Sequence, residues 1–431
     1  MSNFRLARIS LLLAAIGLSA VPAVHAQDKP ADAKAEAPKD AVRPELHKLL
    51  DPKVVQPLMT AKNYAEIKKL IDQADAFPNK NPYETYVIDR MKLAHASSTG
   101  NDAEAIAALE RVTASGRLDK KEQETFLQAL GNYYFNGKDY PKAIATYQRF
   151  GTETGKPEVV RTALIRAHYL SGDYATTVKM MGEDLDAMAK AGKVPSEEDL
   201  RLYASSANKV KDNASYVKGL ELLVTHYPSD ELWADLLGRL QSRQSYDLRL
   251  QADLYRLLNS VSATMGSDEY VELAELDLAA GIPTEAKTVV DAGFKAGILG
   301  TGPQAANHKK LRDRANKGAA DDAKNIASGE AGAHKNKDGI GLVNLGYAYV
   351  TMGQFDKGID LIQKGIAKGT RRQEDAKLRL GIAYLKAGRK DEAIKAFESV
   401  KGDQNLNDLA RYWILHAKRP AGAAAPAAGA E

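Results

Sequence analysis

Cysteine is absent from the 431 residues of this chain, which excludes disulfide bonds, thiolate catalysis and cysteine-based metal sites. Aromatic residues are scarce as well, at 7%, and only two of them are tryptophan. The formal net charge is only +4, so the overall charge gives no case for a nucleic-acid partner. Beyond the N-terminal segment no run of about 18 apolar residues occurs, and we expect no transmembrane segment there.

The N-terminal segment has the pattern of a bacterial export signal. Arg5 and Arg8 precede a mainly apolar run over residues 9–21, and small residues lead up to Ala26. We therefore predict a Sec-type signal peptide, cleaved near Ala26/Gln27, and a periplasmic or secreted protein. An uncleaved membrane anchor is the alternative. Without the leader, which carries two arginines and no acid, the net charge falls from +4 to +2.

The centre of the sequence pattern is a repeat between residues 345 and 400. The same residue types recur 35 positions apart. The matched pairs are Leu345 with Leu380, Gly346 with Gly381, Tyr349 with Tyr384, Gly353 with Gly388, Gly358 with Ala393, and Ile362 with Phe397. A unit of this length predicts two antiparallel helices and two turns, with the small residues where the helices approach closely. Such a hairpin cannot bury both faces alone and must stack on neighbours.

This pattern resembles the tetratricopeptide repeat, whose period is about 34 residues. The resemblance implies an all-α solenoid, a superhelix of stacked helix hairpins with a concave groove for a ligand. Leu130 to Phe150 is a second clear copy, and a weaker copy begins 34 residues later at Leu164. Leu273 to Gly293 recovers the pattern once more.

Changes in composition divide the chain into segments. Residues 297–341 are rich in small and polar residues, and we expect a poorly matching helix pair or a mobile hinge there. The expected segments are 1–26 signal peptide, 27–43 disordered linker, 44–296 N-terminal helical array, 297–341 weakly matching segment, 342–418 C-terminal repeats with a capping helix, and 419–431 disordered Ala/Pro tail.

No catalytic motif assembles in the sequence. The stretch Gly151 to Lys156 is one residue short of a phosphate-binding loop and follows no predicted strand. The eight histidines include no pair at i, i+4, which argues against a helix-borne metal site. We expect no cofactor, no metal and no enzymatic activity; an active site built from residues far apart in the sequence is the remaining alternative.

The candidate ligand contacts follow from the resemblance. In tetratricopeptide proteins the ligand contacts the first helix of each pair, on the side away from the second helix. The positions on that side are Gln128, Asn132, Phe135, Asn136, Thr162, Arg166, Tyr169, Val343, Tyr347, Thr351, Ile382 and Lys386. The family's carboxylate-binding clamp is not matched, because Ala163 stands where an asparagine is required.

The sequence therefore predicts a non-catalytic scaffold of the bacterial cell envelope that binds a protein or peptide segment in a helical groove. The alternative is a solenoid that binds an envelope polysaccharide such as peptidoglycan, or that docks a glycan-processing enzyme. Solvated surface residues would also explain each groove position taken singly.

Overall fold

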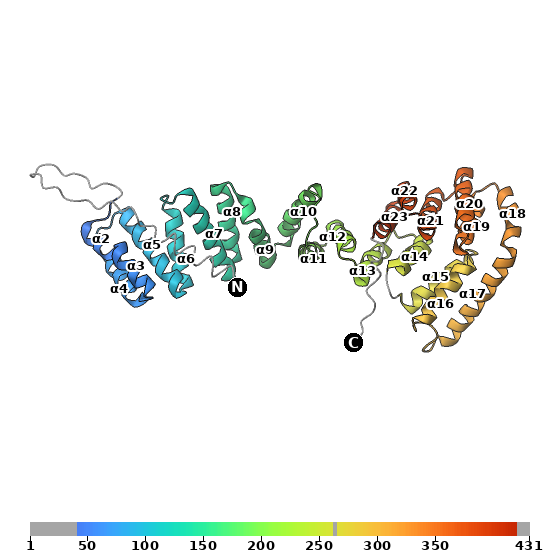
Figure 1. Cartoon of the computed structure of the whole chain (residues 1–431), viewed down its shortest axis with the longest axis horizontal. Helices are drawn as coiled ribbons and strands as arrows, with labels where there is room; N and C mark the ends of the chain where they lie inside the picture. Colours follow the sequence, from blue (N-terminus) through green and yellow to red (C-terminus); the bar gives the residue numbers. More distant parts are fainter. Residues whose placement is uncertain (1–40, 262–264, 420–431) are drawn as a thin grey trace, which may run out of the picture. The chain divides into compact units, whose positions relative to one another are not determined.

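The computed structural model describes residues 41–261 and 265–419 (Figure 1). Helices joined by short turns make up these ranges, which confirms the predicted all-α class of stacked helix hairpins. The predicted signal peptide, nearly all of the predicted linker and all but the first residue of the predicted tail lie outside the described residues. No described helix is both long enough and apolar enough to cross a membrane.

The chain divides into two compact units, Met1–Asp184 and Leu185–Glu431. The division falls inside helix α10 (Tyr174–Lys190), within the segment 44–296 that the sequence treats as one array. Each unit is described by itself below, as unit 1 and unit 2.

Unit 1 is a series of stacked helices. Its elements are α2 (Pro44–Leu50), α3 (Pro52–Thr60), α4 (Tyr64–Asp75), α5 (Pro82–Thr99), α6 (Asp102–Ala114), α7 (Lys120–Asn136), α8 (Tyr140–Thr154), the 3-10 turn η1 (Pro157–Val159), α9 (Arg161–Ser171) and the start of α10. Helices α5 and α6 form one hairpin and α7 and α8 the next, with α6 packed on α7 and α8 on α9. Their apolar sides share one continuous core, in which Phe126, Tyr147 and Phe150 are buried.

Unit 2 begins with two further hairpins of this kind and ends with the C-terminal helix. Its elements are α11 (Glu197–Lys209), α12 (Asn213–His226), α13 (Asp230–Gln241), η2 (Leu248–Leu250), α14 (Gln251–Val261), α15 (Ser267–Ala279), α16 (Pro283–Lys295), α17 (Ala305–Asn325), η3 (Ile326–Gly329), α18 (Glu330–Lys335), α19 (Ile340–Thr351), α20 (Phe355–Lys368), α21 (Gln373–Lys386), α22 (Lys390–Glu398) and α23 (Gln404–Ala417).

Side-chain caps begin many of these helices. Asn81 opens α5 with a capping box, in which its side chain accepts from the backbone of Glu84 and the Glu84 carboxylate accepts from the backbone of Asn81. In the next hairpin, the side chain of Asp119 caps α7 and that of Asp139 caps α8. Because the first backbone N–H groups of a helix have no partner within it, such caps fix where each helix begins.

Glycines decide how closely α19 and α20 approach each other. A Cβ at Gly346 would lie 2.5 Å from the carbonyl oxygen of Gly358, and a Cβ at Gly358 would lie 2.5 Å from that of Gly346. The obstacles are backbone atoms, which cannot rotate away. Gly353 then follows the end of α19 with a φ of +80°, a conformation that glycine adopts without the Cβ strain of other residues. Both results confirm the roles predicted for these glycines.

The segment 297–341 forms one long helix and one short one. Helix α17 has 21 residues and packs on α15 and α16, while α18 has only six. Leu311 and Ala315 are buried, as their apolar character suggests, but Ala323 is exposed. Two ion pairs at the surface also connect α17 to its neighbours, Arg314 with Glu275 at 2.8 Å and Arg312 with Asp291 at 2.7 Å.

The C-terminal helix α23 does more than cap the last hairpin. It packs on α21 and α22 and also on α12, α13 and α14, so the end of unit 2 lies against its beginning (Figure 1). Arg243 of the α13–α14 connection bonds Asp408 of α23 at 2.7 Å, and Arg249 bonds Asp375 of α21 at 2.6 Å. Unit 2 therefore closes on itself through charged contacts between residues more than a hundred positions apart.

Candidate functional site

The predicted ligand contacts lie on the helices assigned to them. We call the side of a hairpin's first helix that these positions were predicted to share the first-helix face. The positions are Gln128, Asn132, Phe135 and Asn136 on α7; Thr162, Arg166 and Tyr169 on α9; Val343, Tyr347 and Thr351 on α19; and Ile382 and Lys386 on α21. The two units differ in what covers these residues.

On α7 of unit 1 these side chains reach the surface. Asn136 is exposed, and Gln128, Asn132 and Phe135 are half-buried. The Tyr147 hydroxyl donates to the Oδ1 atom of Asn132 at 2.8 Å, and burial raises the pKa of Tyr147 so that it remains a donor. This bond fixes the amide plane with its Nδ2 donors away from Tyr147. The face thus presents oriented amide groups beside an aromatic ring.

An aromatic pair marks the ends of α7 and α9. Phe135 meets Tyr140 edge-on, with ring centroids 5.8 Å apart. Tyr169 meets Tyr174 in the same way at 5.4 Å, 34 positions further along in both members. Edge-to-face contacts of this kind hold a ring in one orientation, so Phe135 and Tyr169 are fixed, half-exposed apolar contacts.

One residue of this face escaped the sequence prediction. Leu170 of α9 is 48% exposed, beside the predicted Tyr169. Leu170 lies 34 positions after Asn136, which is one repeat period. The repeat spacing could therefore have identified it from the sequence. Thr162 and Arg166 on the same helix are exposed as well. A large apolar side chain next to polar ones is a typical feature of binding surfaces.

In unit 2 most of the corresponding positions are covered, although Lys386 is exposed. Tyr347 and Ile382 are at most 1% exposed, and Thr351 is half-buried. Val343 does not lie on the first-helix face at all: it packs toward Gly365 of the partner helix α20, because that glycine leaves room for its methyl groups. A ligand at Tyr347 or Ile382 would have to displace the chain's own packing, and their roles as ligand contacts stay predictions.

The cover over α19 and α21 is built around Arg256 of α14. This guanidinium is 5% exposed and lies 5.0 Å from the ring centre of Tyr347. It donates to Asp253 at 2.7 Å, to Glu285 of α16 at 2.8 Å and to Asp277 of α15. We call these four charged residues, Arg256, Asp253, Asp277 and Glu285, the Arg256 cluster.

Two helices of the C-terminal repeats bond directly to this cluster. The Tyr347 hydroxyl donates to Glu285 at 3.2 Å, and the Lys386 ammonium lies 3.1 Å from the same carboxylate. Helices α14 and α16 are thereby joined to α19 and α21. None of these contacts was foreseen, because nothing in the sequence relates Arg256 to a tyrosine 91 positions away.

The carboxylates of the cluster differ in their affinity for protons. Burial favours the neutral form of Glu285, but Arg256 and Lys386 outweigh it and lower its pKa to about 2. Burial raises the pKa of Asp277 to about 7, and the neighbouring carboxylates act in the same direction against Arg256. Glu285 pairs with Lys386 as well as with Arg256, whereas burial dominates at Asp277, which therefore keeps its proton to a higher pH.

The described residues contain no group of three or more histidine or acidic side chains that could hold a metal ion. The Arg256 cluster also lacks an exposed nucleophile, since its carboxylates already bind cations. Its chemistry is that of a buried ion-pair network that joins helices. The accessible surface of unit 1 instead carries amide groups and fixed aromatic rings, which can bind a partner.

Comparisons with known proteins agree with the repeat pattern. A tetratricopeptide repeat family model matches residues 343–408. A search of curated protein sequences gives no match.

Loose structural similarity extends over more of the chain. Yeast Sti1, in its TPR2AB-domain:pHSP90 complex, shares 14% identity over 69% of this chain and 100% of that chain, with a TM-score of 0.22. Yeast Tom70 shares 11% identity over 87% of this chain and 96% of that one, with a TM-score of 0.18. At these TM-scores neither structure bears on how this chain binds a ligand. The family match covers most of the hairpins α19–α20 and α21–α22, which are similar to tetratricopeptide repeats.

Proposed function

We propose that this protein is a non-catalytic scaffold that holds a protein or peptide segment against the first-helix face of unit 1. The surface consists of α7 and α9, with Asn132, Asn136, Phe135, Tyr169 and Leu170 as its main contacts. Tetratricopeptide repeats generally act by binding other proteins, and the match at residues 343–408 supports that class of activity.

One observation carries the choice of unit 1. At one repeat position, Arg166 of α9 is exposed and Asn132 of α7 is half-buried, whereas Tyr347 of α19 and Ile382 of α21 are at most 1% exposed. Arg256 and the carboxylates bound to it already contact the face of α19 and α21, so this face is not free to bind another protein. The open face combines half-exposed aromatic rings with amide donors, the two features that suit a peptide's side chains and its backbone.

The cell envelope is the proposed place of action. Support comes from the N-terminal sequence alone, in which Arg5, Arg8 and the apolar run 9–21 have the order of a signal peptide. The absence of cysteine is compatible with an oxidising compartment, because no thiol is present to oxidise.

The test is site-specific photocrosslinking in the producing cell. A photoreactive amino acid replaces Asn136 or Leu170, both exposed on the first-helix face. The control places it at Gln148, which is exposed on α8, the second helix of the same hairpin. We expect one protein partner to be captured from positions 136 and 170 and not from 148.

A second measurement tests the same surface quantitatively. Phe135→Ala combined with Tyr169→Ala removes both fixed rings, and we expect binding of the captured partner to weaken at least tenfold. Equal capture from all three positions, or an unchanged affinity in the double variant, would show that this face is not the binding surface. Saturable binding of a glycan with no protein captured would favour the polysaccharide alternative.

A further inference from the structure

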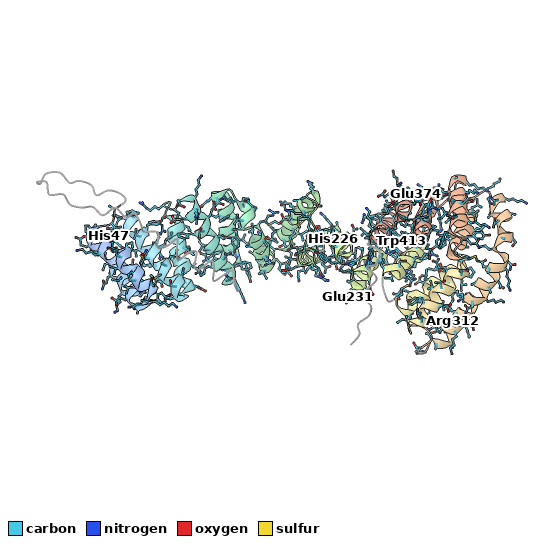
Figure 2. All side chains as sticks on the ribbon, in the orientation of Figure 1. His47, His226, Glu231, Arg312, Glu374 and Trp413 are labelled. Carbon is cyan, nitrogen blue, oxygen red and sulfur yellow. The ribbon has the colours of Figure 1, made fainter. Side chains whose placement is uncertain are left out.

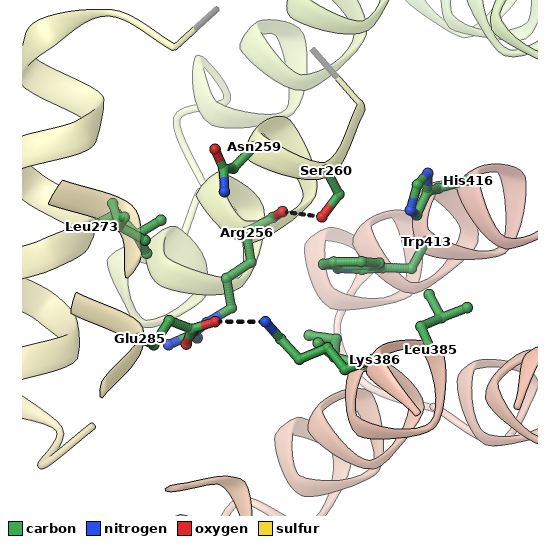
Figure 3. Close-up of a pocket in the computed structure, with 11 residues that line it drawn as sticks. Arg256, Asn259, Ser260, Leu273, Glu285, Leu385, Lys386, Trp413 and His416 are labelled. Atoms are coloured by element: carbon green, nitrogen blue, oxygen red, sulfur yellow. Dashed lines mark hydrogen bonds and ion pairs between the residues drawn. The ribbon is translucent and has the colours of Figure 1, made fainter. Parts of the chain in front are cut away.

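A cavity of about 170 Å³ lies inside unit 2, between α14, α15, α16, α21 and α23 (Figure 3). It includes two of the predicted ligand contacts, Ile382 and Lys386. Its volume is comparable to the roughly 150 Å³ that accommodates a benzene molecule in a protein interior. The cavity therefore has room for one ring-sized molecule. Asn259 and Ser260 are exposed at its edge, so a solute can reach it.

Two ring nitrogens at this cavity have no hydrogen-bond partner among the described residues. They are the Nε1 atom of Trp413 and the Nδ1 atom of His416, both buried. Trp413 is only 2% exposed, and its ring extends from α23 toward the Arg256 side of the cavity (Figure 3). Indole Nε1–H is purely a donor, and a buried donor without a partner costs about 1–3 kcal/mol. A ligand that supplies an acceptor would remove this cost.

Lys386 is the group at the cavity that can attract an anionic acceptor. The Lys386 ammonium uses one contact for Glu285 at 3.1 Å, and an ammonium group has three N–H donors. Glu285 already accepts from Arg256 and Tyr347 as well. At the other end, burial together with the charges of Arg419 and Lys390 lowers the pKa of His416 to about 4. His416 is therefore neutral at pH 7 and lies in a positive field.

The remaining wall is apolar. Leu273 and Val289 line it from α15 and α16, and Ile382 and Leu385 from α21. The first three of these are at most 3% exposed. A ligand with an apolar body would bury that body against them, at about 25 cal/mol for each Å² removed from water. One molecule has to satisfy the donors and the apolar wall together.

We propose that unit 2 binds a small monocarboxylate with an apolar body of about ring size in this cavity. The carboxylate accepts from Lys386 Nζ and Trp413 Nε1, and the apolar body lies against Leu273, Val289 and Ile382. This site is independent of the peptide surface on unit 1, so each can fail without the other.

The probe is sodium benzoate, with benzamide as the neutral molecule of the same shape. The two tryptophans of the chain, Trp233 and Trp413, give two indole N–H signals in a ¹H–¹⁵N spectrum of the full chain, which Trp413→Phe assigns. We expect benzoate to shift the Trp413 signal saturably and leave that of Trp233 in place, and benzamide to bind at least tenfold more weakly.

Variants separate a specific site from general charge attraction. Lys386→Met keeps the apolar stem but removes the ammonium, and should weaken benzoate binding at least tenfold. Lys364→Met, on the exposed side of α20, is the matched control and should bind as the unaltered chain does. If Lys386→Met fails to fold, Leu385→Trp, at a half-buried position, fills the cavity from its wall and should also abolish the shift.

The proposal is wrong if benzoate gives no saturable shift of Trp413, or if benzamide binds equally well. It is also wrong if Lys386→Met, or Leu385→Trp in its place, binds benzoate like the unaltered chain. Protein capture at unit 1 should be the same with and without benzoate, which keeps the two proposals distinguishable.

Discussion

The hairpin α7–α8 of unit 1 and the hairpin α19–α20 of unit 2 carry the same repeat but use it differently. In both, a glycine on the first helix lets the second helix approach: Gly131 faces Tyr147, and Gly346 faces the backbone of Gly358. On the opposite side α7 shows Asn136 to solvent, whereas Tyr347 of α19 is fully buried against Arg256.

This difference shows that the repeat specifies the contacts within and between hairpins. It does not specify which other helices pack over the first-helix face. That cover comes from α14 and from α16, which is the second helix of the repeat copy at Leu273 to Gly293. The result is an open face in unit 1 and a covered face in unit 2, the unit whose Arg312 and Trp413 are labelled in Figure 2. The four predictions below test this contrast. Unfolding of unit 2 can be followed alone, because both tryptophans, Trp233 and Trp413, belong to it.

The largest effect is expected at the centre of the closed unit. Arg256→Met leaves three buried carboxylates without their shared cation, and removing one partner of a buried ion pair costs about 3–5 kcal/mol. Arg312→Met is the control, since that side chain is 44% exposed and pairs only with Asp291. Chemical unfolding followed by tryptophan fluorescence measures both. A loss below 1 kcal/mol for Arg256→Met would mean that the cluster does not hold unit 2 together.

A smaller loss is expected between α19 and α20. Gly346→Ala places a Cβ 2.5 Å from a backbone oxygen, and overpacking of this kind costs about 1–3 kcal/mol. Gly238→Ala is matched to it, because Gly238 lies inside α13 with nothing within 4 Å of the added Cβ. It should stabilise unit 2 by up to about 1 kcal/mol through helix propensity. The same fluorescence measurement gives the change in the free energy of unfolding for both variants. If both variants stabilise unit 2, or both destabilise it, the backbone of α20 does not limit the residue at position 346.

The third prediction concerns pH. Asp277 has a folded-state pKa of about 7 against an ordinary value of 3.8, so the folded chain keeps a proton that the unfolded chain releases. The free energy of unfolding of unit 2 should therefore fall as the pH rises from about 4 to 7 and level off above that.

Asp277→Asn, which cannot ionise, should remove part of this slope. One pKa unit corresponds to about 1.4 kcal/mol, so the change should be at least about 1 kcal/mol between pH 5 and 8. Fluorescence-detected melting at several pH values measures it. If the free energy of unfolding of Asp277→Asn depends on pH as steeply as that of the unaltered chain, another group causes the pH dependence.

The smallest effect on stability is expected on the open face. Leu170→Ser alters a side chain that is 48% exposed, and surface substitutions of this kind usually change stability by less than about 0.5 kcal/mol. Thermal melting by circular dichroism should hardly change, while capture of the protein partner should drop. A marked destabilisation would mean that Leu170 belongs to the packed core, and the contrast between the units would weaken.

Much of the fold followed from residue types and spacing. The glycines at 346, 353 and 358 and the hairpin register of α7–α8 all lie where the pattern put them. These features are local, since a helix end or a close approach depends on residues within one repeat. The candidate site was predicted less fully. Asn132, Phe135 and Asn136 reach the surface as expected, Leu170 was missed, and Tyr347 and Ile382 are buried.

The sequence by itself determined that the chain is helical, that its helices pair into hairpins and that several pairs carry the tetratricopeptide pattern. Periodicity, caps and small residues suffice for that, because each acts over a few tens of residues. Only the tertiary structure decided that α23 packs on α12, α13 and α14 and that Arg256 lies over Tyr347. Those contacts join residues about 90 to 190 positions apart and depend on how small angles between successive helices add up, which no local pattern records.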